Sequence, residues 1–244
     1  MRIYLVNNVK KTKITTAHAA AVVRAINRQL REHVEPYWSI KAEVTHWPWK
    51  ETSLLKATED HHDRAIVYLQ EQPNIEGAIG YHNRTNKGLP YGFVFTDVAD
   101  ELGEPWTVTL SHEVLEILGD PFVNLLAGGP HPNPQERRDV GHWLELCDAV
   151  QAQSYQIDGV DVSNFVLPLY FTVEDEGKPV DYLNTGLKSF GVNPGGYVGF
   201  YDPKRGEHDT YFAKTDKTAS RRLKIKSALG KLRRSTRYTS TLSR

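Results

Sequence analysis

Apolar and polar positions alternate along the first hundred residues in patterns that predict several short strands and one long helix. Thr15 and Thr16 offer N-caps to a helix that runs to about Val34, with apolar residues at helical spacing. Pro36 is expected to end this helix. Strands rich in branched and aromatic side chains are predicted at residues 3–8, 41–47, 64–69 and 91–98, with a further candidate at 78–82.

A second helix is predicted over about 105–119, with Pro105 in its first turn and Gly119 and Pro121 at its end. Apolar residues lie almost all round it, which is typical of a buried, central helix. Its polar residues recur at steps of three and four and therefore share one stripe. The members of this stripe are Thr109, His112, Glu113 and Glu116.

Two carboxylates and an imidazole in a buried helix cost roughly several kcal/mol each unless they are compensated. A divalent metal ion supplies that compensation. His112 and Glu116 are one helical turn apart and are predicted to bind one ion together. Glu113 stands beside them and is predicted to activate a metal-bound water.

The segment Ser111–Glu116 (SHEVLE) resembles the active-site helix of zincin metallopeptidases, whose pattern is His-Glu-x-x-His. Glu116 takes the place of the second histidine. The motif likeness covers residues 111–120, and the order of elements resembles a zincin over about residues 1–120. The resemblance implies an α/β (α+β) zincin-like fold: a small mixed sheet, an edge strand before the buried active-site helix, and an irregular C-terminal half.

In zincins that edge strand binds the substrate as an added strand. Residues 91–98 occupy the corresponding place in the sequence, so Tyr91, Gly92 and Phe93 are expected to bind substrate. The implied cofactor is one zinc ion. Because Glu116 makes the site harder and more anionic, manganese, iron or calcium are alternatives.

The third metal ligand is not fixed by the helix, because Phe122 stands where the metzincin subgroup has its last ligand. Glu145 is the first candidate, since it resembles the gluzincin glutamate carried on a later helix. Asp148 would then orient His112. The spacing of this pair differs by one residue from the usual gluzincin pair, so Asp148 is also open as the ligand. Further alternatives are His142 and Asp120.

Other reactive side chains have simpler interpretations. Cys147 lies in an apolar setting without a clear base and is expected to be inert. Solvated or structural roles are expected for His61, His62, His82, His131 and His142.

Patterns after residue 120 are weaker. Residues 124–139 are predicted to form a loop, and residues 140–150 fit either a short helix or an extended segment. Residues 155–173 carry turn and strand signals. A glycine-rich turn leading into a strand is predicted over 193–201.

The 244 residues are 39% apolar and 25% charged, which indicates a soluble chain with one substantial core. The net charge is zero, but the acidic and basic residues are unevenly distributed along the chain. Residues 1–213 hold 19 basic and 29 acidic residues, whereas residues 214–244 hold 11 basic residues and one acid. A zincin-like catalytic domain over 1–213 and a basic, flexible tail over 214–244 are therefore predicted.

No run is long and apolar enough to span a membrane, and residues 1–8 do not resemble a secretory signal. The single cysteine excludes an internal disulfide. The cytoplasm is the expected location, with association with a virion or export by another route left open. The tail is a candidate for contact with nucleic acid, an anionic membrane or an acidic partner.

The function expected from these residues is metal-dependent hydrolysis of peptide bonds in a peptide or protein substrate, with Glu113 as general base. The alternative is a catalytically silent, zincin-like binding or assembly protein with a structural metal. A hydrolase acting on a non-peptide bond is a third interpretation.

Overall fold

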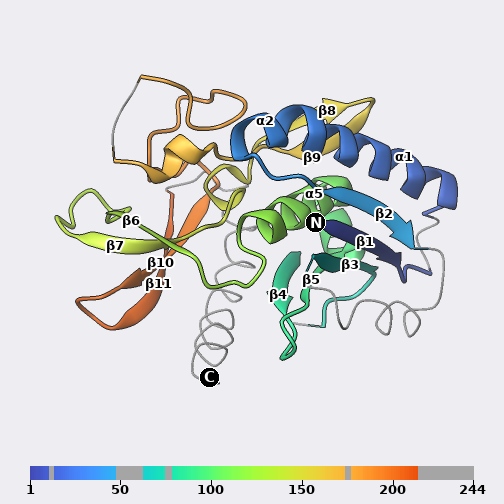
Figure 1. The fold of residues 1–244 in the computed structure, drawn as a ribbon, viewed down its shortest axis with the longest axis horizontal. Coiled ribbons are helices and arrows are strands. Elements are labelled where there is room, and N and C mark those ends of the chain that lie inside the picture. Colours follow the sequence, from blue (N-terminus) through green and yellow to red (C-terminus); the bar gives the residue numbers. More distant parts are fainter. Residues whose placement is uncertain (11–13, 48–62, 75–78, 174–176, 214–244) are drawn as a thin grey trace. The chain divides into compact units, whose positions relative to one another are not determined.

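A computed structural model describes residues 1–10, 14–47, 63–74, 79–173 and 177–213 (Figure 1). The helices are α1 (Thr16–Arg28), the π-helix η1 (Gln29–Val34), α2 (Glu35–Trp38), α4 (Thr96–Leu102), α5 (Trp106–Gly119), and the 3₁₀ helices η2 (Asp148–Val150) and η3 (Pro168–Phe171). The strands are β1 (Arg2–Asn7), β2 (Glu43–Trp47), β3 (Arg64–Gln70), β4 (Gly80–Arg84), β5 (Pro90–Phe95), β6 (Leu126–Pro130), β7 (Asp139–Trp143), β8 (Ser154–Ile157), β9 (Val160–Ser163), β10 (Tyr197–Asp202) and β11 (Glu207–Phe212). The fold is mixed α+β, as expected.

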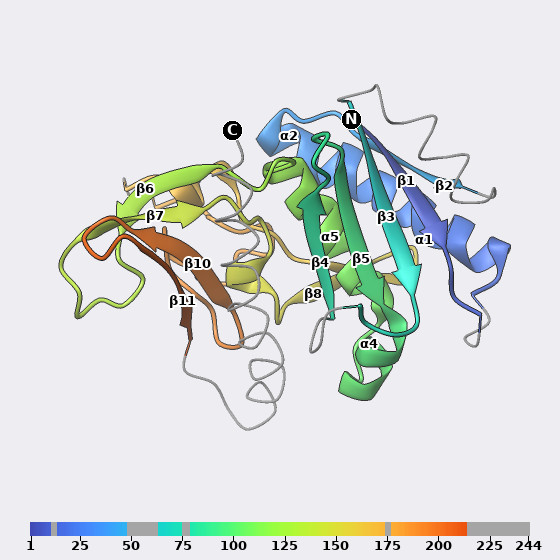
Figure 2. The same cartoon turned by 90° about the horizontal axis from the view of Figure 1, so that it is seen from below.

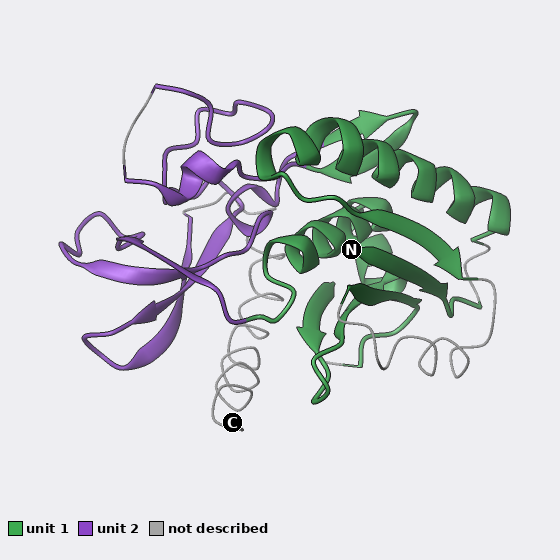
Figure 3. Ribbon diagram, in the orientation of Figure 1, with its two compact units in different colours: residues 1–123, 155–163 green, residues 124–154, 164–244 purple. Residues whose placement is uncertain are grey.

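The chain divides into two compact units, which are coloured separately in Figure 3. Unit 1 comprises Met1–Val123 and Tyr155–Ser163. Unit 2 comprises Asn124–Ser154 and the described residues from Asn164 onward. The grouping of residues 1–213 as one catalytic domain remains a prediction.

Unit 1 is built on a five-stranded sheet with the order β2-β1-β3-β5-β4. β1, β2, β3 and β5 run parallel, and β4 pairs antiparallel with β5. The branched side chains of the inner strands are buried on both faces, as is usual for parallel strands. Figure 2 shows this sheet in front of α1 and α5, which lie together behind it.

The two faces of the sheet differ in character. One carries a core cluster made of Tyr4, Val6, Ile66, Tyr68 and Leu89. The other face receives α5 closely at Gly92, where an added Cβ would lie 3.3 Å from Ile117 Cδ1. Alternate residues of each strand therefore point toward α5, and this alternation positions the site described below.

The first helix begins as predicted. The Thr15 side chain accepts a hydrogen bond from the His18 backbone N–H, and the helix buries an apolar face that includes Val22 and Ile26. The expected end at Pro36 was wrong. Helical structure continues to Trp38, because Pro36 lies in the first turn of α2, where no backbone N–H donor is required.

The strand predicted over 91–98 was also corrected. It ends at Phe95, and Thr96 begins α4. It is not an edge strand, because β5 lies between β3 and β4. Among the described strands the edge on this side is β4, which corresponds to the short strand predicted at 78–82.

The β8–β9 hairpin, apart from its first residue Ser154, completes unit 1. Asp158 and Gly159 form its two-residue turn, with φ of 50° and 76°. Positive φ at both turn positions matches the right-handed twist of a hairpin, and Asp-Gly tolerates it well.

Unit 2 contains a second sheet with the order β11-β10-β7-β6. Its buried apolar cluster includes Val150, Val166 and Tyr170. The loop predicted over 124–139 instead contains β6, which pairs antiparallel with β7. Residues 140–150 are extended in β7 and then turn into η2, and the strand predicted near 193–201 is β10.

Within the described part of the chain, no helix combines the length and apolar character needed to cross a membrane. Three predictions concern residues outside that part: a short helix or loop expected over the polar residues 50–63, of which only Asp63 is described, the pair His61 and His62, and the basic tail 214–244.

Candidate metal centre

Helix α5 forms where the sequence predicted it and is buried along almost its whole length. The polar stripe is buried with it. The exposed fraction is 5% for His112, 2% for Glu113 and zero for Glu116. Fully buried glutamates are rare unless they are paired, so this stripe needs a source of positive charge.

A second element contributes to the cluster. The antiparallel register places His82 of β4 opposite Gly92 of β5 and Gly80 opposite Val94. Because Gly92 faces α5, His82 and Gly80 face α5 as well. His82 is 4% exposed.

The side chains of His82, His112, Glu113 and Glu116 lie close together within unit 1. His82 Nδ1 is 3.2 Å from Glu116 Oε2 and 3.6 Å from Glu113 Oε2. On the other side of Glu116, His112 Nε2 is 2.8 Å from Oε1. We call this set the His–Glu cluster.

No lysine or arginine among the described residues pairs with Glu113 or Glu116. Glu113 Oε2 and both Glu116 oxygens are buried, and within the described part of the chain no donor reaches them with good hydrogen-bond geometry. The imidazole nitrogens are near enough to share a cation with these oxygens. Imidazole and carboxylate are also the donors that zinc-binding proteins use, so the residues present fit a metal ion.

Electrostatics within the cluster oppose the effect of burial. Burial lowers the pKa of His82, but the contacts with Glu113 and Glu116 outweigh it and hold the pKa above its ordinary value. Burial raises the pKa of Glu116, yet His112 and His82 bring it well below its usual range. Both directions favour an ionised Glu116 and therefore a site that attracts positive charge.

Glu113 packs directly against the backbone of β4 because Gly80 has no side chain there. A Cβ at Gly80 would lie 2.7 Å from Glu113 Oε1, 2.7 Å from Thr109 Cγ2 and 2.9 Å from the Phe93 carbonyl oxygen. Only glycine leaves room for the Glu113 carboxylate at this position.

A buried hydrogen-bond network fixes α5 beside this cluster. Ser111 Oγ donates to Gln29 Oε1 at 2.7 Å and accepts from the Ser163 backbone N–H at 3.1 Å. Gln29 Nε2 in turn donates to the Ser163 carbonyl at 2.9 Å and to the Tyr155 hydroxyl at 3.1 Å. The network joins α5 to η1 and β9, so the residue before His112 is anchored from two sides.

Glu145 and Asp148, the predicted third ligand and its partner, belong to unit 2. Both are buried. Glu145 lies between β7 and η2 and not in a helix, which corrects the expectation of a later helix as its carrier. Ligation of an ion by either residue remains a prediction.

The other candidates are placed as follows. Asp120 is the buried C-cap of α5. His142 is buried in unit 2, where Nε2 contacts the Pro130 carbonyl at 2.8 Å and burial lowers the pKa of the ring. Cys147 is fully buried, as expected for an inert thiol. Tyr91 and Phe93 are half-buried in the interior strand β5.

His82 was expected to be a turn or core histidine and is indeed buried, but sequence reasoning did not place it beside Glu113 and Glu116. A signal was present in the small residues around it. Gly80 and Gly92 both allow α5 to approach the sheet closely, and His82 lies two residues after Gly80 and directly opposite Gly92, so it faces α5 as well.

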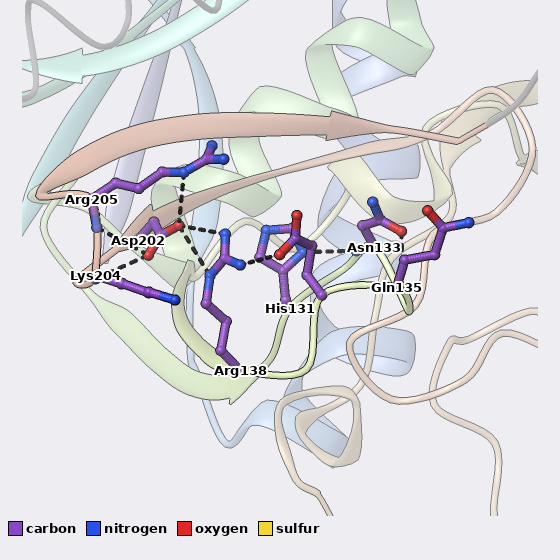
Figure 4. A network of polar contacts seen from close by, with 8 residues as sticks. His131, Asn133, Gln135, Arg138, Asp202, Lys204 and Arg205 are labelled. Carbon is purple, nitrogen blue, oxygen red and sulfur yellow. Dashed lines mark hydrogen bonds and ion pairs between the residues drawn. The ribbon is translucent and has the colours of Figure 1, made fainter.

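A separate polar network lies in unit 2 (Figure 4). Arg138 Nη2 donates to Asp202 Oδ2 at 2.8 Å, and Arg138 also pairs with Glu136. Asp202 Oδ1 accepts from the backbone N–H of Lys204 at 3.0 Å. Asp202 therefore accepts hydrogen bonds at both carboxylate oxygens, and the network ties the residue before β7 to the end of β10 and the turn that follows it.

Comparison of the chain with protein-family models, with curated proteins and with solved structures finds no match. Functional inference therefore depends on the geometry of the site.

Proposed function

We propose that the chain is a metal-dependent hydrolase, with zinc as the first choice of cation, that cleaves peptide bonds with a metal-activated water. The observation that supports this most directly is Glu116. It has no exposed surface, contacts two histidines, and pairs with no lysine or arginine among the described residues.

His112 and Glu116 are the residues that would hold the ion, through Nε2 and Oε1. A bound zinc lowers the pKa of its water and polarises the substrate carbonyl. Glu113 is the proposed general base: its carboxylate takes the proton of the attacking water and passes it to the leaving amine. The zincin resemblance of Ser111–Glu116 supports the same assignment.

Glu145 is the proposed third ligand, with Asp148 as the alternative or as the partner that orients His112. Substrate binding is better assigned beside β4 than along Tyr91–Phe93. The backbone of β5 is already paired on both sides, with β3 and β4, whereas β4 pairs only with β5 and ends the described sheet.

The experiment combines metal analysis with a protease assay on the full chain. Protein is stripped with a chelator, reloaded with zinc, and tested on casein and on a fluorogenic peptide mixture. Glu113→Gln should keep its metal and lose activity by at least about 100-fold, the usual contribution of a general base. Glu101→Gln, an exposed glutamate of α4, is the matched control and should behave as wild type.

Wild-type protein that binds no zinc after reloading would overturn the proposal. Full activity in Glu113→Gln would overturn the assigned mechanism. Zinc that is bound without hydrolysis of any substrate, and whose removal unfolds the chain, would favour a structural metal in a binding or assembly protein.

A further inference from the structure

Glu116 presents its two oxygens to two different histidines. Oε1 faces His112 Nε2 at 2.8 Å, and Oε2 faces His82 Nδ1 at 3.2 Å. A carboxylate arranged in this way can ligate one cation through each oxygen. The proposed catalytic ion accounts for the Oε1 side only.

The Oε2 side has a ligand set of its own. His82, Glu113 and Glu116 each offer one donor atom, and these atoms all lie within 4.8 Å of one another. Ligands about 2.0–2.1 Å from a tetrahedral zinc are separated by about 3.3 Å. The distances from His82 Nδ1 to Glu116 Oε2 and to Glu113 Oε2, 3.2 and 3.6 Å, are close to that separation.

We propose that unit 1 holds a second divalent-cation site, formed by His82, Glu113 and Glu116, with Glu116 bridging it to the catalytic ion. The inference rests on the proposed function because the two sites share Glu116. All three ligands are on β4 and α5, so the second site is complete within unit 1.

The charges of the cluster order the two binding events. The first cation offsets part of the negative charge of Glu116, the carboxylate that both sites share. A second cation at the other oxygen of Glu116 meets less negative charge and is repelled by the first ion, so it binds more weakly. The second cation also binds the Glu113 oxygen that faces His82. A carboxylate bound to a cation accepts a proton less readily, so Glu113 can no longer act as the general base. Occupancy of the second site consequently opposes catalysis, whereas occupancy of the first permits it.

The test is a calorimetric titration of the chelator-stripped full chain with zinc chloride alone, with elemental analysis after dialysis at low and high free zinc. Wild type should take up two equivalents in two resolved steps. His82→Asn should keep only the tight step, and so should Glu113→Gln, which leaves His82 in place. Glu116→Gln should lose both steps. His18→Asn, an exposed histidine of α1, is the control for adventitious zinc and should keep both.

Circular dichroism verifies that each variant is folded, and Glu113→Gln provides a second reading if His82→Asn is not. One equivalent in wild type, unchanged by His82→Asn, would overturn the second site while leaving the proposed function intact. Two equivalents that survive both His82→Asn and Glu113→Gln would place the second ion elsewhere and also overturn it. No zinc in wild type would overturn both proposals.

Discussion

His82 Nδ1, on the edge strand β4, lies 3.2 Å from Glu116 Oε2 on the central helix α5, and both side chains are excluded from solvent. The two residues are far apart in sequence. They meet because the β4–β5 register places His82 on the sheet face against which α5 packs, and Glu116 is on the side of α5 that faces the sheet.

Zinc should stabilise the wild-type chain. An ion that binds only the folded state adds about 2.7 kcal/mol to the free energy of unfolding when its free concentration is 100 times Kd. Glu116→Gln should abolish this gain, because it removes the carboxylate shared by the cluster. Thermal unfolding with chelator and with zinc measures the difference, and an equal zinc-induced shift in the variant would count against Glu116 as a ligand.

Gly80→Ala should destabilise unit 1 by about 1–3 kcal/mol, the usual cost of an overpacked position. The added Cβ would meet Glu113 Oε1 and Thr109 Cγ2, both at 2.7 Å. Denaturant unfolding measures this change. Gly128→Ala is the control, since nothing lies within 4 Å of a Cβ there, and equal effects of the two substitutions would refute the close approach.

Ser111→Ala should cost about 1–3 kcal/mol, because it leaves buried groups of Gln29 and Ser163 without the Ser111 hydroxyl. Denaturant unfolding again provides the measurement. The exposed Ser154→Ala should change the free energy of unfolding far less. A neutral Ser111→Ala would mean that the network does not anchor α5.

Asp202 should contribute to stability at neutral pH but not in strong acid. Desolvation raises the pKa of Asp202, but Arg138 and the backbone N–H groups of Lys204 and Arg205 outweigh it, so the net pKa is lowered. A carboxyl with a lowered pKa in the folded state stabilises above its unfolded value of about 3.9, and this contribution is lost as pH falls through the folded pKa.

The corresponding measurement is thermal unfolding of wild type and Asp202→Asn between pH 7 and pH 2.5. The variant should unfold at a lower temperature at pH 7, and the gap should close in acid. A gap of constant size across this range would show that the Arg138 contact does not depend on the charge of Asp202.

The helix that carries the site could be predicted from the sequence because its signal is local. Apolar residues all round Trp106–Gly119, with one polar stripe, define a buried helix and its special face without knowledge of any neighbour. The strands β1, β3 and β5 were similarly recognisable from their own composition.

His82 could not be found in this way because its role depends on pairing. Its orientation toward Glu116 follows from the β4–β5 register and from the packing of α5 over Gly92. Small and polar residues at the inward positions of β4 also remove the alternation that identifies a strand. The same weak pattern explains why β5 was predicted to be the edge strand: the sequence of β4, which pairs with its outer side, has little of the alternation that identifies a strand.

The position of His82 on β4 has a kinetic consequence. Among the described strands, β4 pairs with β5 alone. Edge strands can detach by local opening at a lower free energy than global unfolding requires. Each such opening would carry His82 away while α5 keeps His112, Glu113 and Glu116. The rate at which an ion held by His82 exchanges with solvent would then be set by how often β4 opens. Amide hydrogen exchange along Gly80–Arg84 should slow when that ion is bound.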